Sequence, residues 1–441
     1  MKKLLISLLI IICIVSILFI GTGCKVKTAT TEEVSATEAG GVTAINFWTD
    51  AGQTDKWPRS FISDFENKNP NIKIIVSTQN EENLKDILRP SIASGKEKLD
   101  MSFWWATPGW TGVLAKDGLL ADLTPLYEKY KWSDFLVDTS GYKVNNKYYS
   151  LTTDWWAFPF VFYNKEIFNK VGVAVPNNIN EFFDISKKIL DAGYIPMVAG
   201  NKDKWPVNAI WCNILLRVIG VEKQNKYYKS AWPGGDSSVN WTDPSVVESF
   251  KILKELVDNK VFQDGVNSID DTAALSMFAN GKAAMWMSGT WGPDMIKGAG
   301  KIDFDVFNFP IIKDNIPMAL IVSPSNAVVV PKYAENKLDA IGKFLDYYVS
   351  KEAQIKAFEN GLISARTDWT AEELNGKVDP IVLEITNFAK KYPAVDLNEQ
   401  AVSPEFNAAE LTNVQQVLDG SVTPEQASAN LEKAASDIRK Q

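Results

Sequence analysis

From residue 42 onward, the chain alternates short apolar runs with amphipathic segments, and this pattern predicts an α/β protein. Apolar or alternating stretches at 44–48, 71–76 and 99–105 predict buried strands. Between them, 61–68 and 84–94 have the apolar spacing of short amphipathic helices. A β-α-β-α-β order favours a mainly parallel sheet covered by helices, with ligand contacts at the carboxyl ends of the strands.

The remainder of the chain contains more predicted helix than strand. Apolar spacing and helix start signals predict helices at 179–192, 246–259, 339–349, 353–360 and 423–439, and strands at 304–309 and 327–330. Because strands return late in the chain, we expect two lobes that the chain visits more than once. We place the N-terminal lobe at 42–151 and 308–348, and the C-terminal lobe at 152–307 and 349–441.

The first residues differ from the rest. Lys2 and Lys3 precede an almost unbroken apolar run at 4–20, which is short for a membrane helix and is followed by small residues before Cys24. This order resembles a bacterial lipoprotein signal, with 1–23 as the signal peptide and Cys24 as the lipidated first residue of the mature chain. An uncleaved N-terminal anchor is the alternative. Both interpretations place the remainder outside the cytoplasmic membrane.

Residues 24–41 contain almost nothing large and apolar, which predicts a flexible linker between the lipid anchor and the folded body. Cys13 would leave with the signal peptide. Cys212 is then the one thiol without a lipid, so no disulfide within the mature chain is expected. Its apolar neighbours predict that Cys212 is a small buried residue rather than a reactive thiol.

The 441-residue chain has no histidine, 15 tryptophans and a net charge of −8. Without histidine, catalysis by Ser-His-Asp or Cys-His systems and zinc sites with histidine ligands are excluded. Two carboxylates suffice for glycoside hydrolysis, so that class of enzyme stays open. The chain has no basic block and no complete glycine-rich phosphate motif, so we expect no nucleic-acid partner, no cofactor and no metal site.

The tryptophans cluster along the sequence, at 104, 105 and 110, at 155 and 156, at 205 and 211, and at 286 and 291. An indole can cover the apolar face of a sugar ring while nearby polar groups bind its hydroxyls. Any single tryptophan can equally be a core residue. Neighbours on a strand point in opposite directions, so one of each adjacent pair can pack inside while the other faces a cleft. Trp132 and Trp369 are isolated, and we assign them to packing or to the surface.

Several segments carry a family resemblance. The run L-D-M-S-F-W at 99–104, followed by G-L-L-A-D-L-T at 118–124, is similar to a stretch of extracellular solute-binding proteins of carbohydrate ABC importers, the family that includes the maltose-binding protein. Y-Y-S-L at 148–151 with F-Y-N-K at 162–165 resembles the family's crossover. F-A-N-G-K-A-A-M at 278–285, followed by G-T-W, resembles its most specific signature.

This resemblance implies a two-lobe fold like that of periplasmic binding proteins, with hinge crossings near 151–154, 304–309 and 347–351. It implies sugar-stacking roles for Trp291 and for Trp104 or Trp105. It places Asp154, Trp155 and Trp156 in a crossover that faces the ligand, and Asp50 and Gln53 in the loop after the first strand. Arg366 falls where some members have an arginine that contacts the sugar. The tryptophan pattern adds Trp205 to this set.

The leading hypothesis is a lipid-anchored protein on the outer face of the bacterial cytoplasmic membrane. It would bind a carbohydrate, an oligosaccharide rather than a monosaccharide, and deliver it as a monomer to an ABC importer permease without covalent chemistry. A secreted two-carboxylate glycoside hydrolase, with Asp154 as one carboxylate, is the alternative from another class. A lipoprotein that binds a peptide or another non-sugar solute is a third.

Overall fold

The computed structural model describes residues 41–441 apart from 52–56, 58–59 and 360–361. The predicted signal peptide, Cys24, nearly all of the linker and Gln53 lie outside the described residues. The part from Val42 to Gln441 forms one compact unit. None of the helices in the described part of the chain combines the length and hydropathy needed to cross a lipid bilayer.

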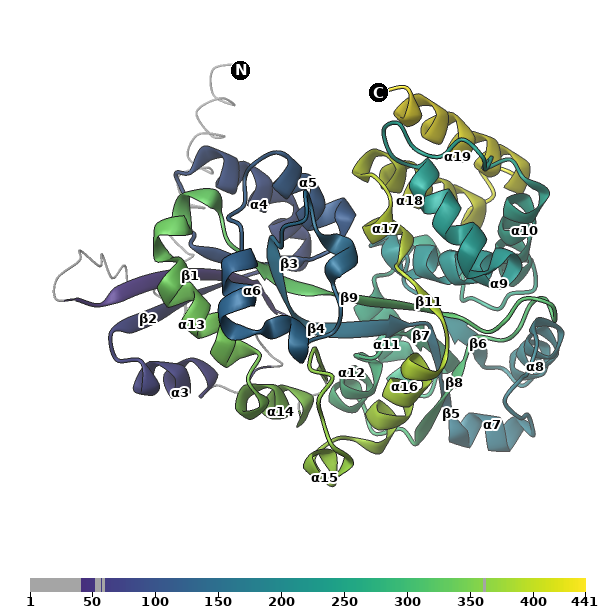
Figure 1. Ribbon diagram of the computed structural model, residues 1–441. Helices are drawn as coiled ribbons and strands as arrows, with labels where there is room; N and C mark the ends of the chain where they lie inside the picture. The colour runs from purple at the N-terminus through teal and green to yellow at the C-terminus, as the bar shows by residue number, and fades with distance from the viewer. Residues whose placement is uncertain (1–40, 52–56, 58–59, 360–361) are drawn as a thin grey trace, which may run out of the picture. The chain divides into compact units, whose positions relative to one another are not determined.

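The larger of two sheets has seven strands in the order β10-β4-β9-β3-β1-β2, with β11 beside β9 (Figure 1). These strands are β1 (Thr43–Asp50), β2 (Ile72–Gln79), β3 (Met101–Trp105), β4 (Ser150–Phe158), β9 (Leu320–Val329), β10 (Ile363–Ser364) and β11 (Ala394–Val395). β1 pairs in parallel with β2 and β3, whereas β9 runs antiparallel to both β3 and β4.

The smaller sheet has the order β6-β7-β5-β8. Its strands are β5 (Phe160–Asn164), β6 (Ile195–Val198), β7 (Ala283–Ser288) and β8 (Phe304–Asn308). Only β6 and β7 are parallel. The expectation of a mainly parallel sheet in each lobe is therefore wrong, because both sheets are mixed. Helical crossovers produce the parallel β1-β3 part, but β9 returns from the opposite direction and pairs antiparallel on both sides.

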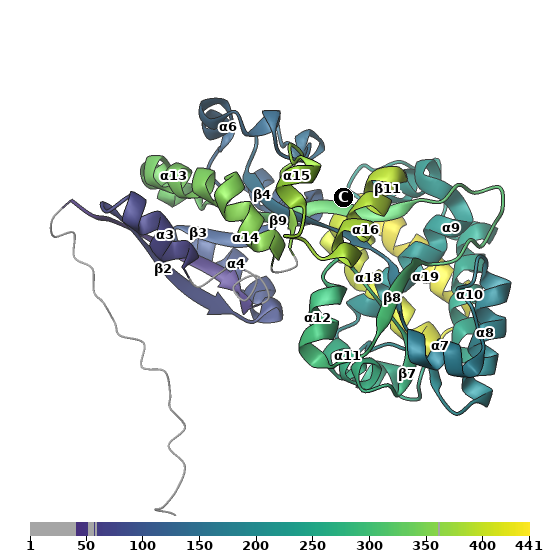
Figure 2. The ribbon, with the colours of Figure 1, turned by 90° about the horizontal axis from the view of Figure 1, so that it is seen from below.

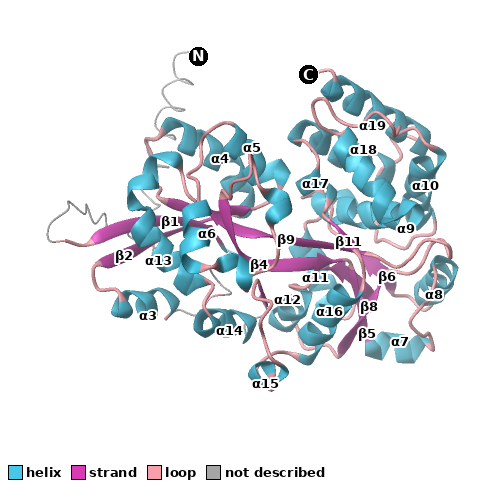
Figure 3. Cartoon of the chain, in the orientation of Figure 1, coloured by secondary structure: helices cyan, strands magenta, loops and turns pink. Residues whose placement is uncertain are grey.

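The helices cover both sheets (Figure 3). On and beside the larger sheet lie α3 (Phe61–Lys68), α4 (Glu81–Ser94), α5 (Val113–Lys116), α6 (Thr124–Tyr130), α13 (Leu338–Tyr348), α14 (Lys351–Glu359) and α15 (Ala371–Leu374). The others are α7 (Lys165–Val171), α8 (Ile179–Asp191), α9 (Trp205–Ser230), α10 (Pro244–Asp258), α11 (Asp271–Ala279), α12 (Gly292–Ala299), α16 (Pro380–Lys391), α17 (Asn398–Ala401), α18 (Pro404–Leu418) and α19 (Pro424–Arg439). The predicted helices are confirmed to within about three residues at each end.

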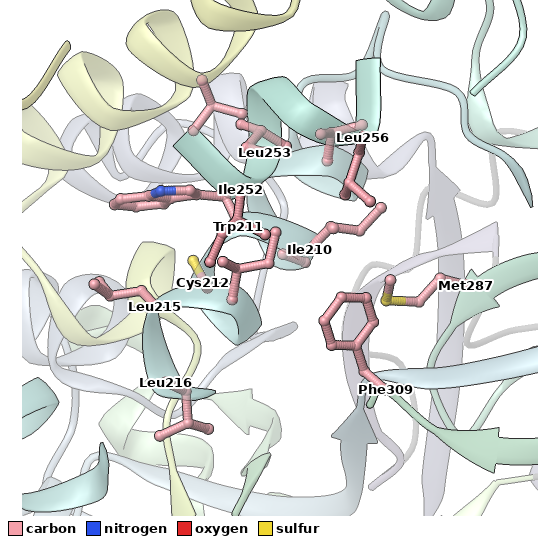
Figure 4. Close-up of a cluster of buried hydrophobic side chains, with 14 of the residues drawn as sticks. Ile210, Trp211, Cys212, Leu215, Leu216, Ile252, Leu253, Leu256, Met287 and Phe309 are labelled. Atoms are coloured by element: carbon pink, nitrogen blue, oxygen red, sulfur yellow. The ribbon is translucent and has the colours of Figure 1, made fainter. Parts of the chain in front are cut away.

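Buried apolar side chains form two large hydrophobic cores, which define the two lobes. The first core joins β1, β3, α3, α4 and α13, and Phe47 and Phe344 are among its members. The second core gathers α9, α10, α18 and α19, and every residue of α9 from 206 to 219 is buried. Figure 4 shows Trp211 and Cys212 inside this second core. The buried position predicted for Cys212 is confirmed.

A smaller apolar cluster joins side chains of the second sheet to side chains of α11, α12 and α16. Figure 2 shows these three helices near β8. Phe278 and Trp286 are fully buried there, which agrees with their apolar spacing in the sequence. Between β7 and α11, the turn at Gly281 has a positive φ of 68°, a backbone conformation that favours glycine.

The strands β4 and β9 pass from one core to the other. Leu151 and Val328 pack in the first core, whereas Phe158 and Ile321 pack in the second. The crossing expected at 151–154 lies within β4. The crossing expected at 304–309 is wrong, because β8 pairs with β5 inside the second sheet and the return takes place along β9.

The crossing expected near 347–351 is also wrong. Tyr348, Val349 and Ala353 all pack in the first core, and so does Ala365. Side chains of α16 pack beneath the second sheet, so the chain passes to the second lobe after Ala365. The predicted domain boundaries stay a prediction.

Candidate functional site

Three tryptophans come together where β3 ends. The rings of Trp104, Trp105 and Trp110 contact one another with centroids 5.1 to 5.3 Å apart. Trp110 belongs to a π-helical turn, η1 (Pro108–Gly112), which follows β3. Trp104 is 3% and Trp105 7% exposed, so both members of this pair are buried, and which of them contacts a ligand stays a prediction. Trp110 packs across both rings, and the buried indole N–H groups of Trp104 and Trp110 have no partner among the described residues.

Lys85 on α4 lies over this tryptophan group. Its Nζ is 5.2 Å from the ring centroid of Trp105 and forms salt bridges of 2.9 Å with Glu81 and 2.8 Å with Glu82. Burial lowers the pKa of Lys85, but the charges of Glu81, Glu399 and Glu82 outweigh burial and raise it overall. The ammonium therefore stays protonated over the indole face. Sequence reasoning missed Lys85, although an acidic pair three and four residues before a lysine is a detectable helical pattern.

A second tryptophan group lies in the other lobe. The ring centroid of Trp291 is 5.9 Å from that of Trp156 and 6.2 Å from that of Trp205. Trp156 comes from β4, Trp205 begins α9 and Trp291 precedes α12, so three separate elements place these rings. Trp156 is buried, whereas Trp205 and Trp291 are half-buried. The group thus has indole surface that solvent or a ligand can reach.

Gly289 makes the position of Trp291 possible. A methyl group at residue 289 would lie 2.1 Å from the Trp291 ring, closer than any two non-bonded carbon atoms can approach. The indole therefore lies directly on the backbone of residue 289. This contact gives a physical reason for the glycine in the G-T-W sequence that precedes α12.

Two aspartates, one at the end of β1 and one within β4, act on the same tyrosine. Asp154 is 2% exposed and accepts hydrogen bonds from Asn326 Nδ2 at 2.6 Å and Thr153 Oγ1 at 3.2 Å. Burial raises the pKa of Tyr348 well above its usual value, and the charges of Asp154 and Asp50 raise it further. Asp50, at the end of β1, is 5% exposed. The two predicted carboxylates are thus close to the same phenol.

Two predicted site residues lie apart from the tryptophan groups. Trp155 points away from Trp156 and packs against the small cluster beneath the second sheet. Arg366 forms a bidentate pair with Asp368, with N···O distances of 2.8 and 2.6 Å, and donates to the Val349 carbonyl at 2.8 Å. Its guanidinium also lies 3.9 Å from the Phe135 ring centroid. These contacts account for a structural role of Arg366 in the first lobe.

Three tryptophans outside the predicted site set are buried, whereas Trp369 is half-buried. Trp211 and Trp286 are 0% exposed, and their indole nitrogens donate to Ser249 at 3.0 Å and to Asp271 at 3.2 Å. Trp132 is also 0% exposed, which makes it a packing residue rather than a surface residue.

A buried carboxylate lies behind the second tryptophan group. Glu410 on α18 accepts hydrogen bonds of 2.8 Å from Asn208 on α9 and from Asn398 on α17. Burial raises the pKa of Glu410 to about 7, against the lowering effect of these hydrogen bonds. Asn208 lies one turn from Trp205. Sequence reasoning missed Glu410, because nothing local marks a glutamate that tertiary packing buries.

Comparisons with known proteins agree with this architecture. A family model described as bacterial extracellular solute-binding protein matches residues 50–355. An uncharacterized ABC transporter extracellular-binding protein of Pyrococcus horikoshii is 27% identical over 337 residues, 74% of this chain and 74% of the relative. The multiple sugar-binding protein of Streptococcus mutans is 24% identical over 350 residues, 76% of this chain and 78% of the relative. A solved chitin oligosaccharide binding protein has a TM-score of 0.80 at 20% identity, covering 90% of this chain and 99% of that chain.

Proposed function

Because this chain belongs to the bacterial extracellular solute-binding proteins, we propose that it binds an oligosaccharide between its two lobes and delivers it to an ABC importer permease. The observation that carries the proposal is the group formed by Trp156, Trp205 and Trp291. Its three indoles, of which Trp205 and Trp291 are half-buried, come from different elements and make an apolar surface of the kind that sugar rings stack on.

The polar groups around the tryptophans supply the rest of the proposed chemistry. A sugar ring presents hydroxyl groups around its edge, and buried carboxylates are strong acceptors for them. Asp50 and Asp154 are the acceptors that we assign to the ligand. Trp105 and Trp110, with Lys85, form the aromatic surface assigned to the first lobe. Gln53 remains a predicted ligand contact, while Trp104, Trp155 and Arg366 have packing or structural contacts and are less favoured.

The similarity to sugar-binding proteins supports a carbohydrate rather than another solute. The Streptococcus mutans relative is a multiple sugar-binding protein, and the similar solved structure is a chitin oligosaccharide binding protein. The number of indole surfaces supports a ligand of several sugar units, since each stacked ring needs its own platform. We further propose that Cys24 carries a lipid that anchors the monomer to the outer face of the cytoplasmic membrane.

Asp154 also bears on the hydrolase alternative. A retaining or inverting glycosidase needs one carboxylic acid that gives a proton and a second carboxylate that attacks or activates water. Both oxygens of Asp154 already accept hydrogen bonds, from Asn326 and Thr153, which suits a binding role better than proton transfer. We therefore propose binding without covalent chemistry.

Isothermal titration calorimetry of the full chain against neutral xylo-, malto- and chito-oligosaccharides tests the proposal. We expect saturable binding of at least one series, with affinity that changes with the number of sugar units. No binding of any neutral oligosaccharide would contradict the proposed function. Chromatography of the ligand after long incubation tests the alternative. Cleaved product that disappears in Asp154→Asn would establish a hydrolase.

A further inference from the structure

One place where the two lobes meet is a short segment, residues 396–402, here called the strap. The strap follows β11 and includes α17. Several bonds fix it to the second lobe and to the crossing strand β9. Trp232 donates its indole N–H to the Ala401 carbonyl at 2.8 Å, and Ser323 on β9 donates to Gln400 at 3.0 Å. The strap is therefore a firm edge of the second lobe rather than a free loop.

The first lobe touches this strap through several independent contacts. Tyr142, in the short helix η3 (Ser140–Tyr142), donates its hydroxyl to Asp396 Oδ1 at 2.6 Å. Lys85 on α4 and Glu399 on the strap interact electrostatically. Next to the strap, Lys116 on α5 lies 4.9 Å from the ring centroid of Trp232. A hydrogen bond, a cation–π contact and an electrostatic attraction thus all join the first lobe to the strap or to its support.

The backbones of the two lobes also approach each other closely at Gly109, in η1. A methyl group at residue 109 would lie 2.9 Å from the Val402 carbonyl oxygen and 3.0 Å from that of Gln400. Both are backbone atoms, and the amide of Val402 is itself bonded to Asn398. They cannot move aside as the end of a flexible side chain could. A side chain at 109 therefore requires η1 to withdraw from the strap.

We propose that Gly109 is a positioning residue for ligand binding, because its missing side chain lets η1 dock against the strap and hold the two lobes together without ligand. Only the expected effect of Gly109 on ligand affinity rests on the proposed function; its effect on the distance between the lobes does not. Docking brings the first-lobe tryptophans, which include the neighbouring Trp110, up to the second lobe. A ligand that touches both lobes binds more weakly when the conformation in which η1 is docked on the strap is less populated.

Gly112 provides a matched control in the same turn. It has an ordinary right-handed φ of −60°, and a methyl group there would have its nearest neighbour at 3.7 Å, which is normal van der Waals contact. Gly109→Ala and Gly112→Ala therefore add the same atom to the same turn, three residues apart. Only Gly109→Ala places that atom against the other lobe.

The test measures the distance between the lobes in the full chain without ligand. Dyes at Lys96→Cys in the first lobe and Lys188→Cys in the second report this distance by energy transfer in a chain that also carries Cys13→Ser and Cys24→Ser, since both lysines are exposed and Cys212 is buried. We expect Gly109→Ala to lower transfer efficiency and Gly112→Ala to match the unsubstituted protein. With an oligosaccharide found by calorimetry, Gly109→Ala should bind about tenfold more weakly, the effect of a tenfold drop in the docked population.

The two proposals fail in different ways. If no sugar binds, the proposed function is contradicted. The role of Gly109 is still tested in that case, because the distance between the lobes is measured without ligand. Unchanged transfer in Gly109→Ala, or equal changes in both variants, would overturn that role. If Gly109→Ala does not fold, as judged by circular dichroism, Tyr142→Phe replaces it. That change removes the 2.6 Å bond between the lobes without adding volume, and it should lower transfer in the same direction.

Discussion

The carboxylate of Glu410 accepts a hydrogen bond from Asn398 at 2.8 Å, although both side chains are fully buried. Cations usually accompany buried carboxylates, but the nearby groups that act on Glu410 are two asparagines, the Cys212 thiol and the acidic Glu399. The two asparagines come from α9 and α17, so this carboxylate ties the helix that begins at Trp205 to the strap.

This relationship predicts that stability depends on pH in a histidine-free protein. The pKa of Glu410 is about 7 in the fold against 4.5 as its ordinary value, so between these pH values the folded state holds a proton that the unfolded state has lost. The free energy of unfolding should therefore fall as pH rises from 4.5 to 7 and level off above 7. The contribution is about 3 kcal/mol at most. Urea denaturation across this range measures it.

The variant Glu410→Gln isolates that contribution, because it has the same shape and does not titrate. Its stability should change less between pH 4.5 and 7 than that of the unsubstituted protein. Glu405→Gln removes an exposed carboxylate from the same helix and should leave the slope unchanged. A slope that is equally steep in Glu410→Gln would contradict the account. Asp271, whose pKa burial also raises to about 7, supplies a residual slope of the same sign.

Local pattern predicted the helices of this fold well and its sheets less well. The segment 61–68 is a helix at the residues expected, because one face of it is apolar. The sequence pattern predicts strand β9 only from 327, because Ser323, Pro324, Ser325 and Asn326 interrupt the apolar pattern before it. Its antiparallel pairing with β3 and β4 joins residues far apart in sequence, and a local pattern carries no information about such pairing.

In the candidate site, too, local sequence patterns predicted some features and missed those that depend on tertiary packing. Clustered tryptophans marked Trp156, Trp205 and Trp291, which the fold brings together. The sequence could not show that Trp110 covers Trp104 and Trp105, since that depends on the unusual π-helical turn after β3. Lys85 and Glu410 also escaped notice, because their importance comes from burial against distant elements rather than from their neighbours in the chain.

Removing the Trp291 indole should weaken oligosaccharide binding. Trp291→Ala deletes the ring between Trp156 and Trp205, and we expect affinity to fall at least tenfold, about 1–3 kcal/mol, as for a central aromatic residue of an interface. Calorimetry measures the affinity. Trp369→Ala is the control, because that half-buried tryptophan packs on Phe358 outside both tryptophan groups. Equal affinity of Trp291→Ala and the unsubstituted protein would remove Trp291 from the site.

Gly289→Ala should reproduce much of this loss without deleting any ring. The added methyl group would lie 2.1 Å from the Trp291 indole, so the ring must leave its position against the backbone. Gly298→Ala in the following helix is the control, since nothing lies within 4 Å of a methyl group there. It should bind normally and gain about 0.5–1 kcal/mol of stability from better helix propensity. Normal affinity in Gly289→Ala would show that the precise position of Trp291 does not matter for binding.

Lys85 should contribute to stability through the carboxylates around it rather than through its own packing. Lys85→Met keeps an apolar stem under Trp105 but leaves Glu81, Glu82 and Glu399 without their shared cation. Burial already raises the pKa of Glu399, and the charge of Lys85 lowers it, so the substitution should raise that pKa further. We expect the free energy of unfolding, measured by urea denaturation at pH 7, to fall by about 2 kcal/mol. This loss should shrink below about pH 4.5, because the carboxylates then become neutral in both the folded and the unfolded state.

The control is Lys73→Met, which removes an exposed lysine paired with Glu66. It should lower the free energy of unfolding by less than about 1 kcal/mol at either pH. A loss in Lys85→Met that is independent of pH would mean that packing, and not charge, is the contribution of this lysine.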